Sequence, residues 1–114
     1  MSFKTNNKGV KISNEHGKQW YHGSPYFLTT LKKGSSITRN KQLAVAFSHK
    51  PTTVSVNNSG VIEHNGSVNG YLYIIEKQLN EQDIYPHESC LKNDKWEWIT
   101  TKNLRLKLIC KTYL

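Results

Sequence analysis

Short segments of alternating or β-branched residues, separated by turn-forming residues, fill the second half of the chain. Residues 53–56 and 61–64 have this character, and residues 57–60 (NNSG) between them are typical of a hairpin turn. Residues 71–76 (YLYIIE) form a nearly continuous apolar run, which predicts a strand in the centre of a sheet. Successive short strands of this kind indicate an antiparallel sheet.

Two further segments near the C-terminal end alternate in the same way, at residues 96–100 and 104–112. Alternation in the second segment predicts one apolar face, made of Leu104, Leu106, Leu108 and Cys110. Residues 80–95 (NEQDIYPHESCLKNDK) are polar apart from one short apolar patch, and we expect a loop there.

The first half contains an aromatic strand and a helix. Residues 19–22 (QWYH) predict a strand that ends at the turn residues 23–25 (GSP). Residues 40–50 predict a helix, with Asn40 as its N-cap and Pro51 ending it. Residues 35–38 favour a short strand.

Residues 27–34 (FLTTLKKG) indicate a turn of helix or a loop. An early helix followed by many strands predicts an α+β domain with a mainly antiparallel sheet and one or two short helices. We expect one domain over residues 19–114, preceded by a loose polar arm at residues 1–18.

Charge is distributed unevenly along the chain. Residues 1–50 contain nine Lys and Arg residues against the single acid Glu15, whereas residues 51–114 contain seven of each sign. A basic half suggests an anionic partner, either a nucleic acid or a phosphate-bearing small ligand, although a solvated lysine-rich surface gives the same pattern. Since no apolar run is long enough to span a bilayer and the N-terminus lacks a signal-peptide core, we expect a cytoplasmic protein without a membrane partner.

The strongest candidate for chemistry is His22, at the end of the aromatic strand. An imidazole there can hydrogen-bond a ligand hydroxyl or phosphate, and Gly23 next to it lets a ligand approach the backbone. The alternative is a partly buried histidine that only satisfies a neighbouring carbonyl.

The tetrapeptide Tyr21-His22-Gly23-Ser24, followed by the strand at 71–76, by EQDIYP and by WEWIT, resembles the ADP-ribosyltransferase fold. The similarity is to its small rifamycin-inactivating and poly-ADP-ribose-polymerase-like branch. The resemblance implies a split sheet with NAD bound in a cleft, where the tetrapeptide opens the site. It further implies that the histidine holds the nicotinamide-side ribose, and that the glycine backbone meets the carboxamide.

The resemblance also implies an aromatic residue that stacks on the nicotinamide ring and an acid that stabilises the cationic ribose. Phe47 stands where the family usually has a tyrosine, and it is equally compatible with a core position on the helix. Two acids compete for the second role: Glu97, alone among apolar neighbours in WEWIT, and Asp83 in EQDIYP. Arg39 could meet the diphosphate of NAD.

Two functions therefore remain open. One is an NAD-dependent ADP-ribosyltransferase with an unknown acceptor, which could be a protein, a nucleic acid or a small molecule. The other is a non-catalytic basic module that binds a nucleotide or nucleic acid. No metal site is expected, because the spacing of His49, His64 and His87 matches no ligand signature.

Overall fold

The computed structural model describes residues 19–87 and 97–114. The predicted arm at residues 1–18 and residues 88–96, which include the second half of the expected loop, lie outside the described residues. The elements are, in chain order, β1 (Tyr21–Ser24), β2 (Thr30–Leu31), β3 (Ser36–Ile37), α1 (Lys41–Ser48), β4 (Val54–Val56), β5 (Ile62–His64), β6 (Gly70–Ile75), β7 (Ile84–Pro86), β8 (Trp98–Thr100) and β9 (Leu104–Thr112).

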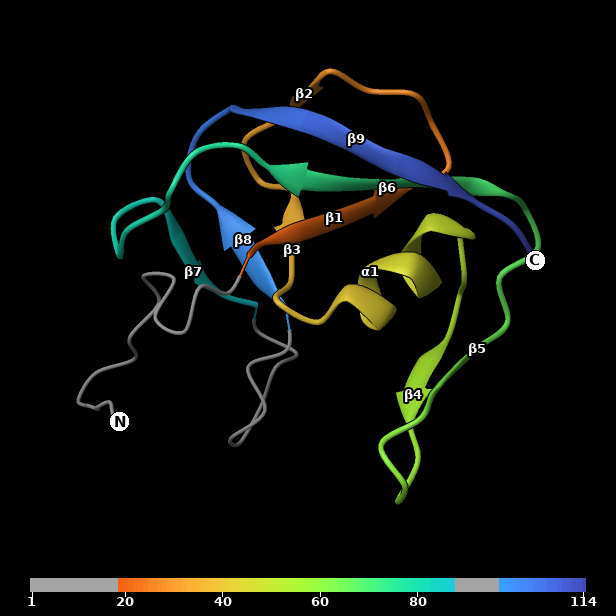
Figure 1. Ribbon diagram of the computed structural model, residues 1–114. Helices are drawn as coiled ribbons and strands as arrows, with labels where there is room; N and C mark the ends of the chain where they lie inside the picture. The colour runs from red at the N-terminus through yellow and green to blue at the C-terminus, as the bar shows by residue number, and fades with distance from the viewer. Residues whose placement is uncertain (1–18, 88–96) are drawn as a thin grey trace.

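A four-stranded antiparallel sheet, in the order β1-β6-β9-β2, forms the larger layer (Figure 1). The predicted central strand is confirmed, since β6 pairs with β1 on one edge and with β9 on the other. A register shift marks a bulge in β9: Leu72 pairs with Cys110 and Tyr73 with Leu108, so Ile109 is the extra residue.

A three-stranded antiparallel sheet, β3-β8-β7, forms a second layer. It joins the first sheet through one isolated pair, Tyr21 with Thr38, which exchange both of their backbone hydrogen bonds. The described part of the chain is therefore an α+β domain of mostly antiparallel sheets with one helix, as the pattern of segments predicts.

The hydrophobic core lies between the two sheets. Trp20 of the first layer and Trp98 of the second meet edge to face, with ring centroids 5.9 Å apart. The other buried members come from both layers and from the loop after β6: Leu31, Ile37, Tyr73, Ile75, Leu79, Ile84, Leu104 and Leu106. Burial of these side chains supplies most of the free energy that holds the two layers together.

The helix α1 begins as predicted, because the Asn40 side chain accepts a hydrogen bond from the Leu43 amide at 2.9 Å. The helix lies directly against β1 and also contacts β6 (Figure 1). A Cβ atom on Gly23 would stand 1.7 Å from the Ala44 carbonyl oxygen, so only glycine permits this close approach.

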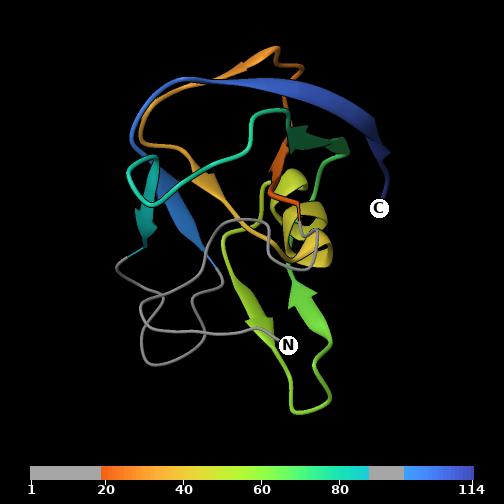
Figure 2. The ribbon, with the colours of Figure 1, turned by 60° about the vertical axis from the view of Figure 1, so that its left-hand side comes forward.

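The predicted hairpin at residues 53–64 is confirmed as β4 paired with β5. In both ribbon views it projects away from the two larger sheets (Figures 1 and 2). Its base contacts the end of α1, where the rings of His49 and His64 stack at 5.5 Å. In the part of the chain that the structure describes, no helix has the length and apolar character needed to cross a membrane.

Four local expectations were wrong. Gly23 and Ser24, expected in a turn, belong to strand β1 because both pair with β6, and Ile84–Pro86, expected in a loop, form β7 by pairing with β8. Residues Thr30–Leu31 form strand β2 on the edge of the larger sheet, because Leu31 is drawn into the core against Leu104, with which it pairs. The apolar face expected along β9 stops at Leu106: Leu108 is 40% exposed and Cys110 is exposed. The bulge shifts the alternation of β9, and the core does not extend to this end of the strand.

The contact between Gly23 and α1 yields a stability prediction. We expect Gly23→Ala to lower the free energy of unfolding by more than about 2 kcal/mol, because the added methyl group must push the helix backbone away. Gly60→Asn in the hairpin turn is the control: Gly60 has φ +83° and open space around it, and asparagine tolerates that conformation. Urea denaturation of both variants tests this, and an unchanged midpoint for Gly23→Ala would contradict the close packing.

Candidate functional site

The two sheets separate immediately after the Tyr21–Thr38 pair. Tyr21 and Thr38 are hydrogen-bonded at 2.7 and 3.0 Å, whereas the next residues of β1 have no backbone pairing with β3. We call this divergence of the two backbones, with His22 and the buried Gly23 on one side and Ser36 on the other, the split.

Gly23 presents its backbone to the split. The Ile75 amide donates a hydrogen bond to the Trp20 carbonyl, so these two residues form a hydrogen-bonded pair. In an antiparallel ladder such pairs recur at every second residue, so His22 is hydrogen-bonded to β6 and Gly23 is not. The N–H and C=O of Gly23 therefore point away from β6, as those of Tyr21 do. Within residues 19–87 and 97–114, no partner for either group is found outside that ladder.

His22 spans the split. Its Nδ1 donates a hydrogen bond to the Ser36 carbonyl at 2.7 Å, which fixes the proton on Nδ1 and leaves Nε2 as an acceptor. Burial lowers the pKa of His22 below its ordinary value, and the hydrogen bond to Ser36 offsets this only in part. The ring is half-buried, and it is neutral at pH 7.

Glu97 lies close to the joint between the sheets. It precedes Trp98, which pairs with Ile37, so Glu97 stands across from Thr38. Thr38 is bonded to Tyr21, so the backbone of Glu97 is two strand spacings, about 10 Å, from that of Tyr21. Side chains of this row share the Tyr21 face, whereas the His22 ring is on the other face with Tyr73. Glu97 is partly exposed, and its carbonyl accepts a hydrogen bond from the His87 amide at 2.9 Å.

Asp83 lies at the opposite end of the second sheet. Its carbonyl accepts from the Thr101 amide, beyond the far end of β8. The carboxylate is buried, and it binds Lys102 at 2.9 Å and the Asn80 amide at 3.0 Å. Burial alone would raise the pKa of Asp83, but the hydrogen bonds from Lys102 and Asn80 outweigh it and hold that pKa below its ordinary value. Asp83 fastens a turn, and the structure does not bring it together with His22.

The other predicted residues surround the split to different extents. Arg39 follows Thr38 and stacks on the Trp20 ring, with its guanidinium carbon 4.8 Å from the centroid. Phe47 is half-buried in the last turn of α1, one residue before Ser48, whose amide lies against Gly23. Ser24 is buried, and its hydroxyl accepts from the Tyr26 amide at 3.0 Å, which makes it a turn residue.

Sequence reasoning missed two contributors to the site. Thr38 forms the joint between the sheets, and the Ser36 carbonyl orients His22. A backbone carbonyl leaves no trace in residue type, so Ser36 could not have been found. The prediction of a short strand at 35–38 was the only available signal for either residue.

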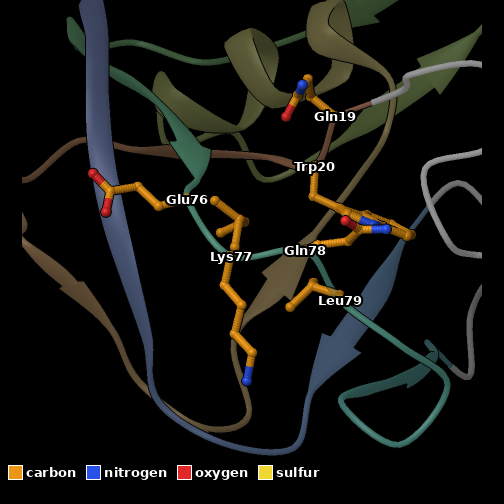
Figure 3. Close-up of a pocket in the computed structure, with 7 residues that line it drawn as sticks. Gln19, Trp20, Glu76, Lys77, Gln78 and Leu79 are labelled. Atoms are coloured by element: carbon orange, nitrogen blue, oxygen red, sulfur yellow. The ribbon is translucent and has the colours of Figure 1, made fainter.

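His22 lines neither of two cavities that described residues bound. One, of about 190 Å³, is lined by Gln19, Trp20, Ile75, Glu76, Lys77, Gln78 and Leu79. Figure 3 shows the charged groups of Glu76 and Lys77 directed away from Trp20, so this cavity lacks a cation aimed at a diphosphate. The other lies at the far end of β9.

His49 and His64 stack on each other without forming a metal centre. The Nδ1 of His49 donates to the Val68 carbonyl at 2.7 Å, and the Nδ1 of His64 accepts from the Gly66 amide at 3.0 Å. Across the described ranges, no three His, Cys, Asp or Glu side chains gather to hold a metal ion.

Comparison with known proteins found no matching family model, no matching curated protein and no matching solved structure.

The environment of His22 yields a pH prediction. Its pKa is below 6.5 in the folded chain, so between about 6.5 and that lower value the unfolded chain binds a proton that the folded chain does not. The folded chain is therefore most stable, as far as His22 is concerned, above pH 6.5, where the ring is neutral in both states. This stability is lost as the pH falls from 6.5 through the lowered pKa of His22.

When the pH is lowered from about 7.5 to about 5, we therefore expect the free energy of unfolding to fall less for His22→Asn than for the unaltered chain. Urea denaturation at the two pH values measures the difference, and comparing the two chains removes the contribution of the other histidines. An equal loss in both chains would show that His22 titrates as it does in water.

Proposed function

We propose that the protein binds NAD at the split and transfers ADP-ribose to an acceptor. One observation carries the proposal: Gly23 offers an adjacent N–H and C=O without strand partners, beside a neutral histidine whose Nε2 is an acceptor. A primary carboxamide has one acceptor and two donors, which complement this pair of backbone groups. The resemblance of Tyr21–Ser24 to the ADP-ribosyltransferase tetrapeptide supports the same assignment.

The residues around the split suit the remaining parts of the ligand. Nε2 of His22 accepts a hydrogen bond from a ribose hydroxyl, since Nδ1 is already committed to Ser36. Phe47 is on the helix that covers Gly23, and it supplies an apolar ring for stacking on nicotinamide. Arg39, beside the joint, supplies a cation for the diphosphate.

In the proposed reaction the bond between the ribose C1′ and the nicotinamide nitrogen breaks first. Nicotinamide leaves as a neutral molecule with the bonding electrons, and the ribose carries positive charge. A lone pair of the acceptor then forms the new bond to C1′, and the acceptor releases a proton to solvent. A fixed carboxylate near C1′ lowers the barrier, because its charge is opposite to the one that develops.

We assign this carboxylate to Glu97 rather than to Asp83. Glu97 stands nearer to the split than Asp83 does, at the joint of the two sheets, although its row with Tyr21 and Thr38 faces the side of β1 opposite to the His22 ring. Asp83 is buried at the other end of β8, where Lys102 and Asn80 occupy its oxygens.

Calorimetric titration with NAD tests binding. We expect a measurable affinity that His22→Ala weakens about 10-fold, because a ribose hydroxyl loses its acceptor. His64→Ala, an exposed histidine of the hairpin, is the matched control and should leave the affinity unchanged. His22→Gln is a second variant to be measured if His22→Ala misfolds, and far-UV circular dichroism shows whether each variant is folded. No heat with NAD for the unaltered, folded chain contradicts the proposal.

Release of nicotinamide from NAD, with water as the acceptor, tests the choice of acid. Glu97→Gln should bind NAD normally and release nicotinamide at least about 100-fold more slowly. Asp83→Asn should instead reduce stability, because its ion pair with Lys102 is lost, and the rate of the folded variant should be retained. The opposite pattern would assign the role to Asp83.

A further inference from the structure

Aromatic side chains gather at the end of the larger sheet where β1 stops. Tyr26 and Phe27, which follow β1, are 62% and 63% exposed, and Tyr113, which follows β9, is 68% exposed. The Phe27 ring meets Tyr71 of β6 edge to face at 5.9 Å. Large aromatic side chains grouped at the surface in this way mark a binding surface.

A cavity of about 220 Å³ opens between these segments. Its lining residues are Pro25, Asn69, Gly70, Tyr71, Lys111, Thr112 and Tyr113. It combines two tyrosine rings with one ammonium group, and none of its lining residues is acidic. We define the distal patch as Tyr26, Phe27, Tyr71, Lys111 and Tyr113.

Hydrogen bonds hold the aromatic loop of the distal patch in place. The buried Tyr73 hydroxyl accepts from the Leu28 amide at 2.7 Å and donates to the Tyr26 carbonyl at 2.9 Å. Burial raises the pKa of Tyr73, so the hydroxyl keeps the proton that it donates. The far end of β9 is also fixed, since the Leu114 amide donates to Asn69 at 3.1 Å. The rings are therefore presented on an ordered backbone, which reduces the entropy lost on binding.

The charges of this sheet select the partner. Strands β1, β6 and β9 contain no Asp or Glu, and the cation of β9 that lies at the distal patch is Lys111, across from Tyr71. A ligand with many negative charges and flat π-faces fits exposed rings next to a lysine, whereas the cations of a partner surface of mixed charge find no acidic counterpart on these strands. A single strand of nucleic acid has both properties. A duplex presents phosphates but hides the faces of its bases.

We propose that the distal patch binds single-stranded nucleic acid, with bases stacked on Tyr113 and Phe27 and with Lys111 on a phosphate. Its position relative to the split follows from the register: Lys111 pairs with Tyr71, and Tyr71 pairs with Ser24, two residues after His22. The patch begins about 7 Å along β1 from His22. The inference does not rest on NAD binding, but it places a nucleic-acid acceptor beside the proposed site.

Fluorescence anisotropy with a labelled single strand of roughly 12 nucleotides, of mixed sequence, tests the proposal on the full chain. We expect binding that Tyr113→Ala weakens about 10-fold, because a base loses its stacking partner. Tyr113→Trp should restore the affinity and Tyr113→Leu should not, since leucine is apolar but has no π-face. The logarithm of the association constant falls linearly with the logarithm of the salt concentration, and Lys111→Ala should reduce the magnitude of this slope by about 0.7, the value for one phosphate contact.

Matched controls come from outside the distal patch. Tyr85→Ala removes a 51% exposed tyrosine of β7, and Lys32→Ala removes an exposed lysine after β2; both should bind as the unaltered chain does. A duplex of the same sequence should bind more weakly than the single strand.

Three results would overturn the proposal: no anisotropy change at about 100 µM protein, equal losses for Tyr85→Ala and Tyr113→Ala, or a preference for the duplex. His22→Ala should leave oligonucleotide binding unchanged, and Tyr113→Ala should leave NAD binding unchanged. Failure of either proposed site is therefore visible separately from failure of the other.

Discussion

The pair of backbone hydrogen bonds between Tyr21 and Thr38 is the interaction on which the rest of the site depends. It joins the two sheets at one point, after which their backbones diverge. Without this joint, β1 and β3 would be unrelated edges, and the His22 ring could not reach the Ser36 carbonyl. A continuous sheet would use the N–H and C=O of Gly23 for pairing, and a fully separated one would expose them to water. The single joint leaves them at the edge of a narrow split.

Helix α1 stabilises this arrangement from one face. The absence of a side chain at Gly23 lets Ala44 and Ser48 approach the strand, so that the backbone of β1 is held rigidly. The hydroxyl of Ser48 also meets that of Thr112 at 2.6 Å, which connects the helix to β9. A preordered backbone edge recognises a flat polar group at low entropic cost. The same glycine therefore serves both packing and the proposed recognition of a carboxamide.

The larger sheet carries the two proposed sites in succession. His22 and Ser24 lie on one face of β1, one side-chain step apart, and Tyr73 lies on the same face between the split and the aromatic loop. The ring centroids of Tyr73 and His22 are 6.4 Å apart, and the Tyr73 hydroxyl is hydrogen-bonded to the backbone of the loop that bears Phe27. One buried side chain thus supports both surfaces, although the two ligands would meet different groups.

Much of the secondary structure followed from local patterns. The Asn40 cap, the NNSG turn and the apolar run at 71–76 each specify an element through interactions among neighbours in the chain, and all three are confirmed. Strand β2 and the exposed end of β9 were missed because two residues of strand, and a bulge, are decided by cross-strand partners.

For the site, the sequence by itself determined that a histidine precedes a glycine in an aromatic strand, and that two acids compete for one role. Only the tertiary structure decided that the Gly23 backbone faces a split, that Nδ1 of His22 is committed, and that Asp83 is bound to Lys102 at the far end of β8. Residue types carry chemistry, but hydrogen-bond partners from distant strands decide which atoms remain available for a ligand.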